Sequence, residues 1–251
     1  MGTSTMALHA ALLALAATYG VTPASAQTVH NIVLVHGAGA DGSGWKGVYD
    51  ILKRDGYNVS VVANPDTGLA DDVAATKRVL ARQDGPVILV GHSYGGVIIS
   101  NAGDDPKVKA LVYIAAFAPD IGESAAQFLP KGPLPGTPTK EGLLFMERNI
   151  YLNAFAPDVP QDVKEFMADS QVPIQLSGVT GKATKAAWKN KPTWYLVSQN
   201  DAIIPPDNER MFARRMKATT VEVAGSHVAF VSHPDVAAKL IEDAATGASP
   251  K

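Results

Sequence analysis

Short apolar runs alternate with longer amphipathic stretches along the chain from Thr28 onward. Strands that are covered on both faces read as continuous apolar runs, and the helices that connect them read as amphipathic stretches. The alternation is therefore typical of a parallel α/β sheet. We expect strands at Ile32–His36, Asn58–Val62, Val87–Gly91, Val108–Ala115, Thr193–Ser198 and Thr220–Val223. The predicted fold class is α/β, with a doubly wound, mostly parallel sheet of about six strands.

Helix signals fill the stretches between these runs. The clearest stretch, residues 69–82, has two aspartates in its first turn and two arginines in its last turn, which complements the helix dipole: Asp71, Asp72, Arg78 and Arg82. Prolines mark the starts and stops of other helices. We expect these after Ser93 with a stop at Asp104-Asp105-Pro106, from about Pro206 to Lys217, and from Pro234 onward.

Residues 118–190 interrupt the alternation. They contain eight of the 17 prolines and no obvious strand of the main sheet. A long insertion between two core strands is more often a functional lid than a plain loop, so we expect a small cap here, inserted after the fourth strand. Most of its bulky apolar side chains should pack onto the core and a few should face a pocket; they are Phe128, Leu143, Leu144, Phe145, Met146, Tyr151, Phe155, Phe166, Met167 and Trp188.

Composition narrows the possible functions. The chain has 251 residues, of which 46% are apolar, and a formal net charge of −2. A chain of this kind can bury a sizeable core, and one domain is the better expectation for its size. The near-neutral charge argues against a nucleic-acid partner. Because there is no cysteine, the chain has no disulfide, no thiolate nucleophile and no cysteine-based zinc site. The oligomeric state cannot be read from the sequence.

The first 26 residues contain no charged side chain. An apolar run over Ala7–Ala17 leads to Ala24-Ser25-Ala26, which fits the small-x-small rule for signal-peptide cleavage and would leave Gln27 as the first mature residue. The run is too short to span a membrane. We therefore expect a periplasmic or secreted protein whose residues 27–251 form a single domain. Because no Lys or Arg precedes the apolar run, a cytoplasmic protein with an apolar extension is the alternative.

The segment Val87–Ile99 combines an apolar strand, the pattern Gly-x-Ser-x-Gly and an apolar helix. Ser93 stands between Gly91 and Gly95 in this pattern. In a sharp strand-to-helix turn, side chains at the two glycine positions would clash with the backbone. The helix that follows points its first N–H groups at developing negative charge. The segment therefore predicts that Ser93 is a catalytic nucleophile.

A nucleophilic serine needs partners elsewhere in the chain. A base must take the hydroxyl proton, and an acid must orient the base. In this architecture the chain order is serine, acid, histidine. Asp201 directly follows the strand Thr193–Ser198, and His227 follows the last strand. Because the carboxyl ends of parallel strands meet at one edge of the sheet, we expect both side chains to lie beside Ser93.

Other residues compete for the same roles. Asp120 follows the strand Val108–Ala115 and is the serious rival for the acid. Among the histidines, His92 lies inside the turn itself, off the line of the nucleophile. His233 directly precedes Pro234, where it fits a helix cap better than a base.

The oxyanion of an acyl-transfer intermediate requires two preorganised N–H donors. One should be the amide of Tyr94, the residue after the nucleophile. The other should come from the turn after the first strand, His36-Gly37-Ala38-Gly39, in which the Ala38 amide is the best candidate. Both expected donors are main-chain groups.

At these motifs the chain resembles the α/β-hydrolase superfamily, from about Val29 to Ala245. The segments VLVHGAGADGSGW, DDVAATKRVL, LVGHSYGGVII and VYIAAFAPD look like a bacterial branch of esterase-like hydrolases related to plant methylesterases and hydroxynitrile lyases. The resemblance implies a Ser–His–Asp triad, no cofactor or metal, and a cap over an apolar pocket. The lyases carry a lysine directly after the catalytic histidine, whereas Val228 stands here. This difference favours a carboxylesterase acting on small to medium uncharged esters over a lyase.

Two alternatives belong to other classes. Gly37-Ala38-Gly39-Ala40-Asp41-Gly42 satisfies the glycine pattern of an NAD-dependent oxidoreductase, and Asp66 could be offered as its ribose-binding acid. That assignment leaves the serine, histidine and aspartate motifs unexplained. A hydrolase-fold binding protein or receptor with slow turnover is the second alternative, because a fold does not fix a function.

Overall fold

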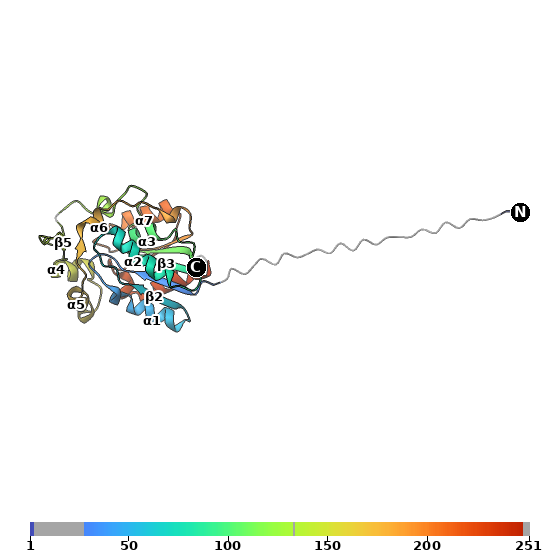
Figure 1. The fold of residues 1–251 in the computed structure, drawn as a ribbon. Coiled ribbons are helices and arrows are strands. Elements are labelled where there is room, and N and C mark those ends of the chain that lie inside the picture. Colours follow the sequence, from blue (N-terminus) through green and yellow to red (C-terminus); the bar gives the residue numbers. More distant parts are fainter. Residues whose placement is uncertain (3–27, 133, 248–251) are drawn as a thin grey trace.

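The computed structural model describes residues 1–2, 28–132 and 134–247 (Figure 1). Apart from its first two residues, the expected signal peptide lies outside these ranges, and so does its cleavage site. Within the same ranges, none of the helices combines the length and the apolar character needed to cross a membrane.

Six parallel strands form the central sheet in the order β2-β1-β3-β4-β7-β8. They are β1 (Asn31–Val35), β2 (Asn58–Val62), β3 (Val87–His92), β4 (Val108–Ile114), β7 (Thr193–Ser198) and β8 (Thr219–Val223). All six lie where the sequence predicts them, within one residue at either end. Strands β1, β3 and β7 are buried along their whole length, which explains their continuous apolar runs.

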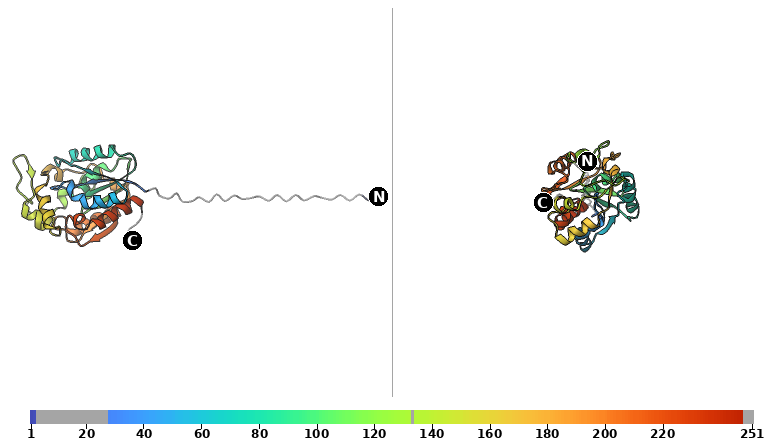
Figure 2. Two further views of the ribbon diagram at one scale, coloured as in Figure 1. Left: turned by 90° about the horizontal axis from the view of Figure 1, so that it is seen from below. Right: turned by 90° about the vertical axis from the view of Figure 1, so that its left-hand side faces the viewer.

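Helices cover both faces of this sheet (Figures 1 and 2). One layer contains α1 (Lys46–Arg54) and α9 (Pro234–Thr246), with η1 (Gly42–Trp45) and α8 (Ala229–Ser232) beside them; the other contains α2 (Leu69–Ala81), α3 (Gly95–Ala102) and α7 (Pro206–Met216). Successive strand residues serve opposite layers: Val33 packs with α2 and α3, whereas Ile32 and Leu34 pack with α1 and α9. The doubly wound arrangement is confirmed.

The cap, residues 118–190, follows β4 and precedes β7, as predicted. Its elements are short: η2 (Ala125–Phe128), β5 (Leu143–Leu144), α4 (Arg148–Ile150), η3 (Tyr151–Phe155), α5 (Gln161–Asp169), β6 (Ile174–Gln175), α6 (Leu176–Thr180) and η4 (Ala187–Lys189). β5 and β6 pair with each other, antiparallel, and contribute no strand to the main sheet. In Figures 1 and 2 most of these elements gather at one end of the molecule.

An arginine from the core fixes the cap where its chain enters and leaves. Arg215 of α7 donates to both carboxylate oxygens of Glu123, at 3.0 and 2.9 Å, and to the Ala118 carbonyl. Its guanidinium also stacks over the ring of Trp188, 5.4 Å from the centroid. The Trp188 indole N–H in turn donates to the Pro119 carbonyl at 3.0 Å. The two stems of the cap are therefore tied to each other and to α7.

The two ends of the described fold meet away from the cap. The Val29 N–H, just before β1, donates to the Ala245 carbonyl near the end of α9 at 2.9 Å. This contact lies at the amino edge of the sheet, because Val29 precedes the first residue of β1. The carboxyl edge, from which the predicted site residues emerge, is the opposite one.

Candidate active site

Ser93 occupies a strained turn between β3 and α3. Its φ is +52°, in the left-handed region that side chains other than glycine rarely adopt. The two flanking glycines make the turn possible. A Cβ at Gly91 would lie 2.6 Å from the Gly95 carbonyl oxygen, and a Cβ at Gly95 would lie 2.7 Å from the carbonyl oxygen of Val35. These contacts are too short for any side chain, so the turn requires the glycines at both positions, as the sequence predicts.

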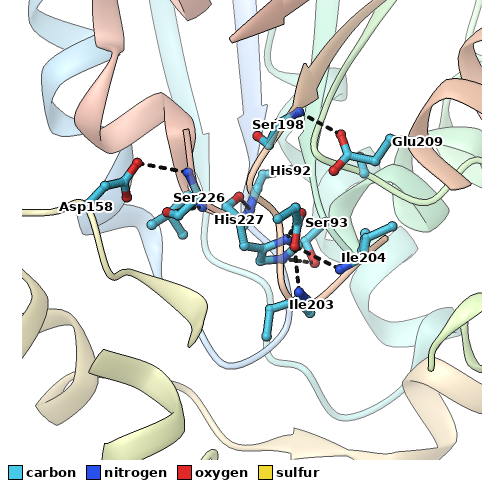
Figure 3. Close-up of polar contacts among 12 residues, drawn as sticks. His92, Ser93, Asp158, Ser198, Ile203, Ile204, Glu209, Ser226 and His227 are labelled. Atoms are coloured by element: carbon cyan, nitrogen blue, oxygen red, sulfur yellow. Dashed lines mark hydrogen bonds and ion pairs between the residues drawn. The ribbon is translucent and has the colours of Figure 1, made fainter. Parts of the chain in front are cut away.

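The structure brings Ser93, His227 and Asp201 together in one hydrogen-bonded chain. The Ser93 Oγ lies 2.8 Å from His227 Nε2, and His227 Nδ1 lies 2.6 Å from Asp201 Oδ2 (Figure 3). The side chains of His227 and Asp201 are completely buried. With the proton on Nδ1, His227 donates to the carboxylate and accepts the serine hydroxyl. The Ile203 and Ile204 amides donate to the other oxygen of Asp201, at 2.6 and 2.8 Å, and hold the carboxylate in place.

Asp120, the rival for the acid, lies elsewhere. Its carboxylate is partly exposed and forms an ion pair with Lys189 at 2.5 Å, at the base of the cap. The Lys189 hydrogen bond lowers the pKa of Asp120. Asp201 is therefore the carboxylate that contacts His227.

The turn after β1 lies directly against the nucleophile. A Cβ at Gly37 would come within 2.6 Å of the Ser93 Cβ. The turn is held from behind by His36, whose Nε2 accepts the Asn64 N–H at 3.0 Å, while the Asn64 side chain donates to the His36 carbonyl at 3.0 Å. Burial lowers the pKa of His36, which keeps the ring neutral and able to accept.

The two expected oxyanion donors are both placed at the nucleophile. Ala38 and Tyr94 line the same pocket as Ser93. Neither amide donates a hydrogen bond to another group of the described residues. Both N–H groups are therefore free to donate to an oxygen of a substrate that reacts at Ser93.

Among the described residues, His227 is the histidine that forms a hydrogen bond with the Ser93 hydroxyl. His92 is fully buried, and burial first and the neighbouring His227 next hold its pKa well below the usual value. Its Nε2 lies 3.0 Å from the His227 carbonyl oxygen, so the neutral ring donates to the main chain of that residue. His233 stands at the position before α9, as predicted, but its side chain makes no capping hydrogen bond.

A buried acid pair lies behind Tyr94, where the sequence suggested only a helix-dipole role for Asp72. Asp72 stands in the first turn of α2 as predicted, but it is completely buried and has further contacts. Its Oδ2 accepts the Tyr94 hydroxyl at 2.9 Å, and its Oδ1 accepts the Asp66 N–H at 2.8 Å. Asp66 is also fully buried, with a φ of +54°. Burial, followed by the charge of Asp72, raises the pKa of Asp66 to about 8.

The pocket above Ser93 is formed jointly by the core and the cap. Its empty volume, mouth included, is about 690 Å³. The cap contributes three of the bulky side chains singled out above, Leu144, Met146 and Phe155, together with Leu129, Leu134, Pro135, Ile174, Leu176 and Val179. Others of that set serve packing, and Phe145 and Phe166 are exposed. Among the described residues, no Lys, Arg, Asp or Glu lines the pocket.

The described part of the chain contains no group of three or more His, Asp or Glu side chains placed to hold a metal ion. The site therefore consists of the hydrogen-bonded chain from Asp201 to Ser93, the two amides and the apolar pocket.

Comparison with known proteins places this chain among the alpha/beta hydrolases. The model of the alpha/beta hydrolase family matches residues 32–240. A carbendazim-hydrolysing esterase from Nocardioides sp. is 34% identical over 115 residues, which cover 40% of this chain and 48% of that protein. A pyrethroid hydrolase from Sphingobium wenxiniae is 28% identical over 86% of this chain and 88% of its own length. These matches confirm the predicted resemblance and favour hydrolysis over the NAD-binding alternative.

A solved structure gives the same result for the fold. The crystal structure of a pyrethroid hydrolase from Sphingobium faniae superimposes with a TM-score of 0.74, at 25% identity, over 87% of this chain and 98% of that chain. The similarity in fold therefore extends over nearly the whole of that protein.

Proposed function

Because the chain belongs to the alpha/beta hydrolase family, we propose that it is a carboxylesterase which acts on small to medium uncharged esters through an acyl-enzyme at Ser93. One observation carries the proposal: a continuous chain of hydrogen bonds runs from Asp201 through His227 to Ser93 at the base of an apolar pocket. Acyl transfer by a serine requires this arrangement of nucleophile, base and orienting acid.

In the first half of the proposed reaction, the Ser93 Oγ attacks the ester carbonyl carbon while His227 Nε2 takes the hydroxyl proton. Asp201 keeps the imidazole in the required tautomer and stabilises the imidazolium that forms. The carbonyl oxygen becomes an oxyanion, which the Ala38 and Tyr94 amides bind. The helix that begins behind Ser93 adds its positive dipole end to this stabilisation.

His227 then gives the proton to the alcohol oxygen, the ester C–O bond breaks and the alcohol leaves, which completes the acyl-enzyme. The second half is the hydrolysis of this acyl-enzyme. A water molecule then attacks the acyl-enzyme and transfers a proton to His227. The tetrahedral intermediate collapses, the carboxylic acid leaves, and Ser93 regains its proton. Every proton in this cycle passes through His227, so an intact Ser93–His227 contact is necessary for both halves.

The pocket supports an uncharged substrate with a sizeable apolar part. A charged ester would lose its water without gaining an opposite charge, which is unfavourable, whereas an apolar group is favourably buried. The relatives described as carbendazim and pyrethroid hydrolases are consistent with this class. The residue directly after His227 is the buried Val228, whereas the lyases carry a lysine at this position.

A labelling experiment tests the proposal. The protein is incubated with a fluorophosphonate probe, and turnover of p-nitrophenyl acetate and butyrate is measured in parallel. We expect covalent labelling at Ser93, and Ser93→Ala should abolish it and lower turnover by on the order of 10⁴ to 10⁶. Ser177→Ala, on the exposed side of the cap, is the matched control and should behave as the wild type.

The outcomes separate the alternatives. Wild-type turnover in the Ser93→Ala variant contradicts the proposal. A labelled protein that binds esters without turning them over would be a binding protein of the same fold, and an unlabelled protein that binds NAD would be an oxidoreductase. For an active esterase, a series of esters of increasing chain length then defines the acyl preference.

We also propose, on the charge-free N-terminal segment alone, that the chain is exported to the periplasm or medium and cleaved after Ala26. Mass spectrometry of the exported protein should find Gln27 at its N-terminus. A cytoplasmic protein that retains Met1 would contradict this proposal.

A further inference from the structure

A second acid, Glu209, is buried directly behind Asp201. It belongs to the first half of α7, and its side chain is 0% exposed. Its Oε2 accepts the Ser198 N–H at 3.0 Å (Figure 3). The carbonyl oxygen of the same Ser198 accepts the Asp201 N–H at 3.3 Å, so the two acids are attached to one residue. The Oε1 of Glu209 is buried as well and meets no donor among the described residues.

Two carboxyl groups buried close together inside a protein do not both carry a charge, because little water is present to reduce their repulsion. The number of donors decides which of them is ionised. Asp201 accepts three hydrogen bonds, from the amides of Ile203 and Ile204 and from His227. Glu209 accepts one, from Ser198. The charge therefore belongs to Asp201 and the proton to Glu209.

In the described part of the chain, the other titratable groups near Glu209 make no hydrogen bond to its carboxyl group. Arg210 lowers the pKa of Glu209 only as the last of its causes, because its guanidinium donates to Glu222 at 2.7 Å and to Asp207 at 3.1 Å. Tyr195 is buried, and its hydroxyl is engaged with the main chain of Ala116. Burial, followed by the Asp201 charge, accordingly raises the pKa of Glu209 well above its usual value.

We propose that Glu209 is a neutral carboxylic acid in the working enzyme and that its O–H donates to the Asp201 carboxylate. The proposal rests on the role of Asp201 as the triad acid. Glu209 touches neither substrate nor the reacting atoms, so it is a positioning residue: it restrains rotation of the Asp201 carboxylate and withdraws part of its negative charge from His227.

Two substitutions of similar size separate this role from simple packing. Glu209→Gln keeps a neutral side chain that donates to Asp201 and accepts from Ser198, so its kcat should stay within about twofold of the wild type. Glu209→Met fills the same space but donates nothing, and its kcat should fall by about tenfold with little change in KM. Asp207→Asn, on the exposed side of the same helix, is the matched control and leaves kcat unchanged.

The pH profile gives the decisive readout. If Glu209 is neutral, Glu209→Gln does not move the acid limb of kcat/KM, because no charge near His227 has been removed. In Glu209→Met the limb should move to higher pH, because Asp201 then presents its full charge to His227. A limb that moves to lower pH in Glu209→Gln would show a charged glutamate in the wild type and overturn the proposal.

Infrared spectroscopy tests the proton directly, without any activity. The difference spectrum between the wild type and Glu209→Gln should contain the C=O stretch of one protonated carboxyl group at neutral pH. A carboxylate band in its place refutes the inference. A wild-type protein that fails to react with the fluorophosphonate would refute the proposed esterase function instead, so the two failures are distinguishable.

Discussion

Replacing Asp66 by asparagine should make the protein more stable at neutral pH. Asp66 is completely buried, and its pKa is raised from 3.8 to about 8 by burial and by Asp72. At pH 7 the folded protein therefore holds a proton that the unfolded chain has released. For each pH unit between 3.8 and 7, the free energy of unfolding falls by about 1.4 kcal/mol. At pH 7 the total loss amounts to about 4 kcal/mol.

Asparagine removes this loss without changing the shape of the side chain. It carries no charge in either state, and it tolerates the left-handed backbone at this position, where φ is +54°. Between about pH 4 and pH 8 the folded wild type binds more protons than the unfolded chain, so its stability falls as the pH rises. The difference in free energy of unfolding between Asp66→Asn and the wild type should therefore grow across this window. At pH 7 the pH-dependent part of this difference should reach about 4 kcal/mol.

Urea unfolding at a series of pH values measures the effect. The three tryptophans, Trp45, Trp188 and Trp194, are all buried and report unfolding by fluorescence. Ser177→Ala, at an exposed position of α6, is the control, and its stability should follow that of the wild type at every pH. If the difference between Asp66→Asn and the wild type is also independent of pH, Asp66 is ionised in the folded protein and the reasoning is refuted.

Two further predictions concern the acid of the triad and the base of the cap. Asp201→Asn should lower kcat by about 10⁴-fold, because the amide favours the wrong tautomer of His227, whereas Asp120→Asn should leave kcat nearly unchanged; the opposite ranking in the p-nitrophenyl butyrate assay would make Asp120 the acid. Arg215→Ala should destabilise the protein by about 2 kcal/mol in urea unfolding and expose the cap to proteolysis, because it leaves Glu123 and the Ala118 carbonyl without their donor. An unchanged unfolding midpoint and proteolysis rate would show that the cap does not depend on this contact.

The sequence predicts the sheet and the nucleophile turn well because both depend on local rules. Strands buried on both faces read as continuous apolar runs, and this property identifies β1, β3 and β7. The turn at Ser93 leaves no room for a Cβ at Gly91 or Gly95, so its glycines are visible as a motif. The positions of Asp201 and His227 follow from one further rule, that parallel strands end at the same edge.

The residues that the sequence analysis missed depend on contacts between distant segments. Asp72 and Glu209 both stand in the first turn of a helix, where an acid has a sufficient local reason to occur. Only the fold brings Asp72 to the Tyr94 hydroxyl and Glu209 to the amide of Ser198. The burial of these two side chains indicates a further role for each. Burial of this kind cannot be read from a single sequence.

The pocket lining is the other part that could not be predicted. The elements of the cap are two to nine residues long, too short for a hydrophobic period to identify their inner faces. The side chains of Phe145 and Met146 are adjacent in sequence and equally apolar, yet Met146 lines the pocket and Phe145 is exposed.

The hydrogen bond between Val29 and Ala245 has a practical consequence. It brings the two ends of the described fold together at the edge of the sheet opposite the pocket. A tether to a bead or an electrode, attached near either end, would therefore leave the mouth of the pocket facing the solution. The same proximity would allow a short peptide to join the two ends in a circular permutant, with the new ends opened in a surface loop and the active-site edge left intact.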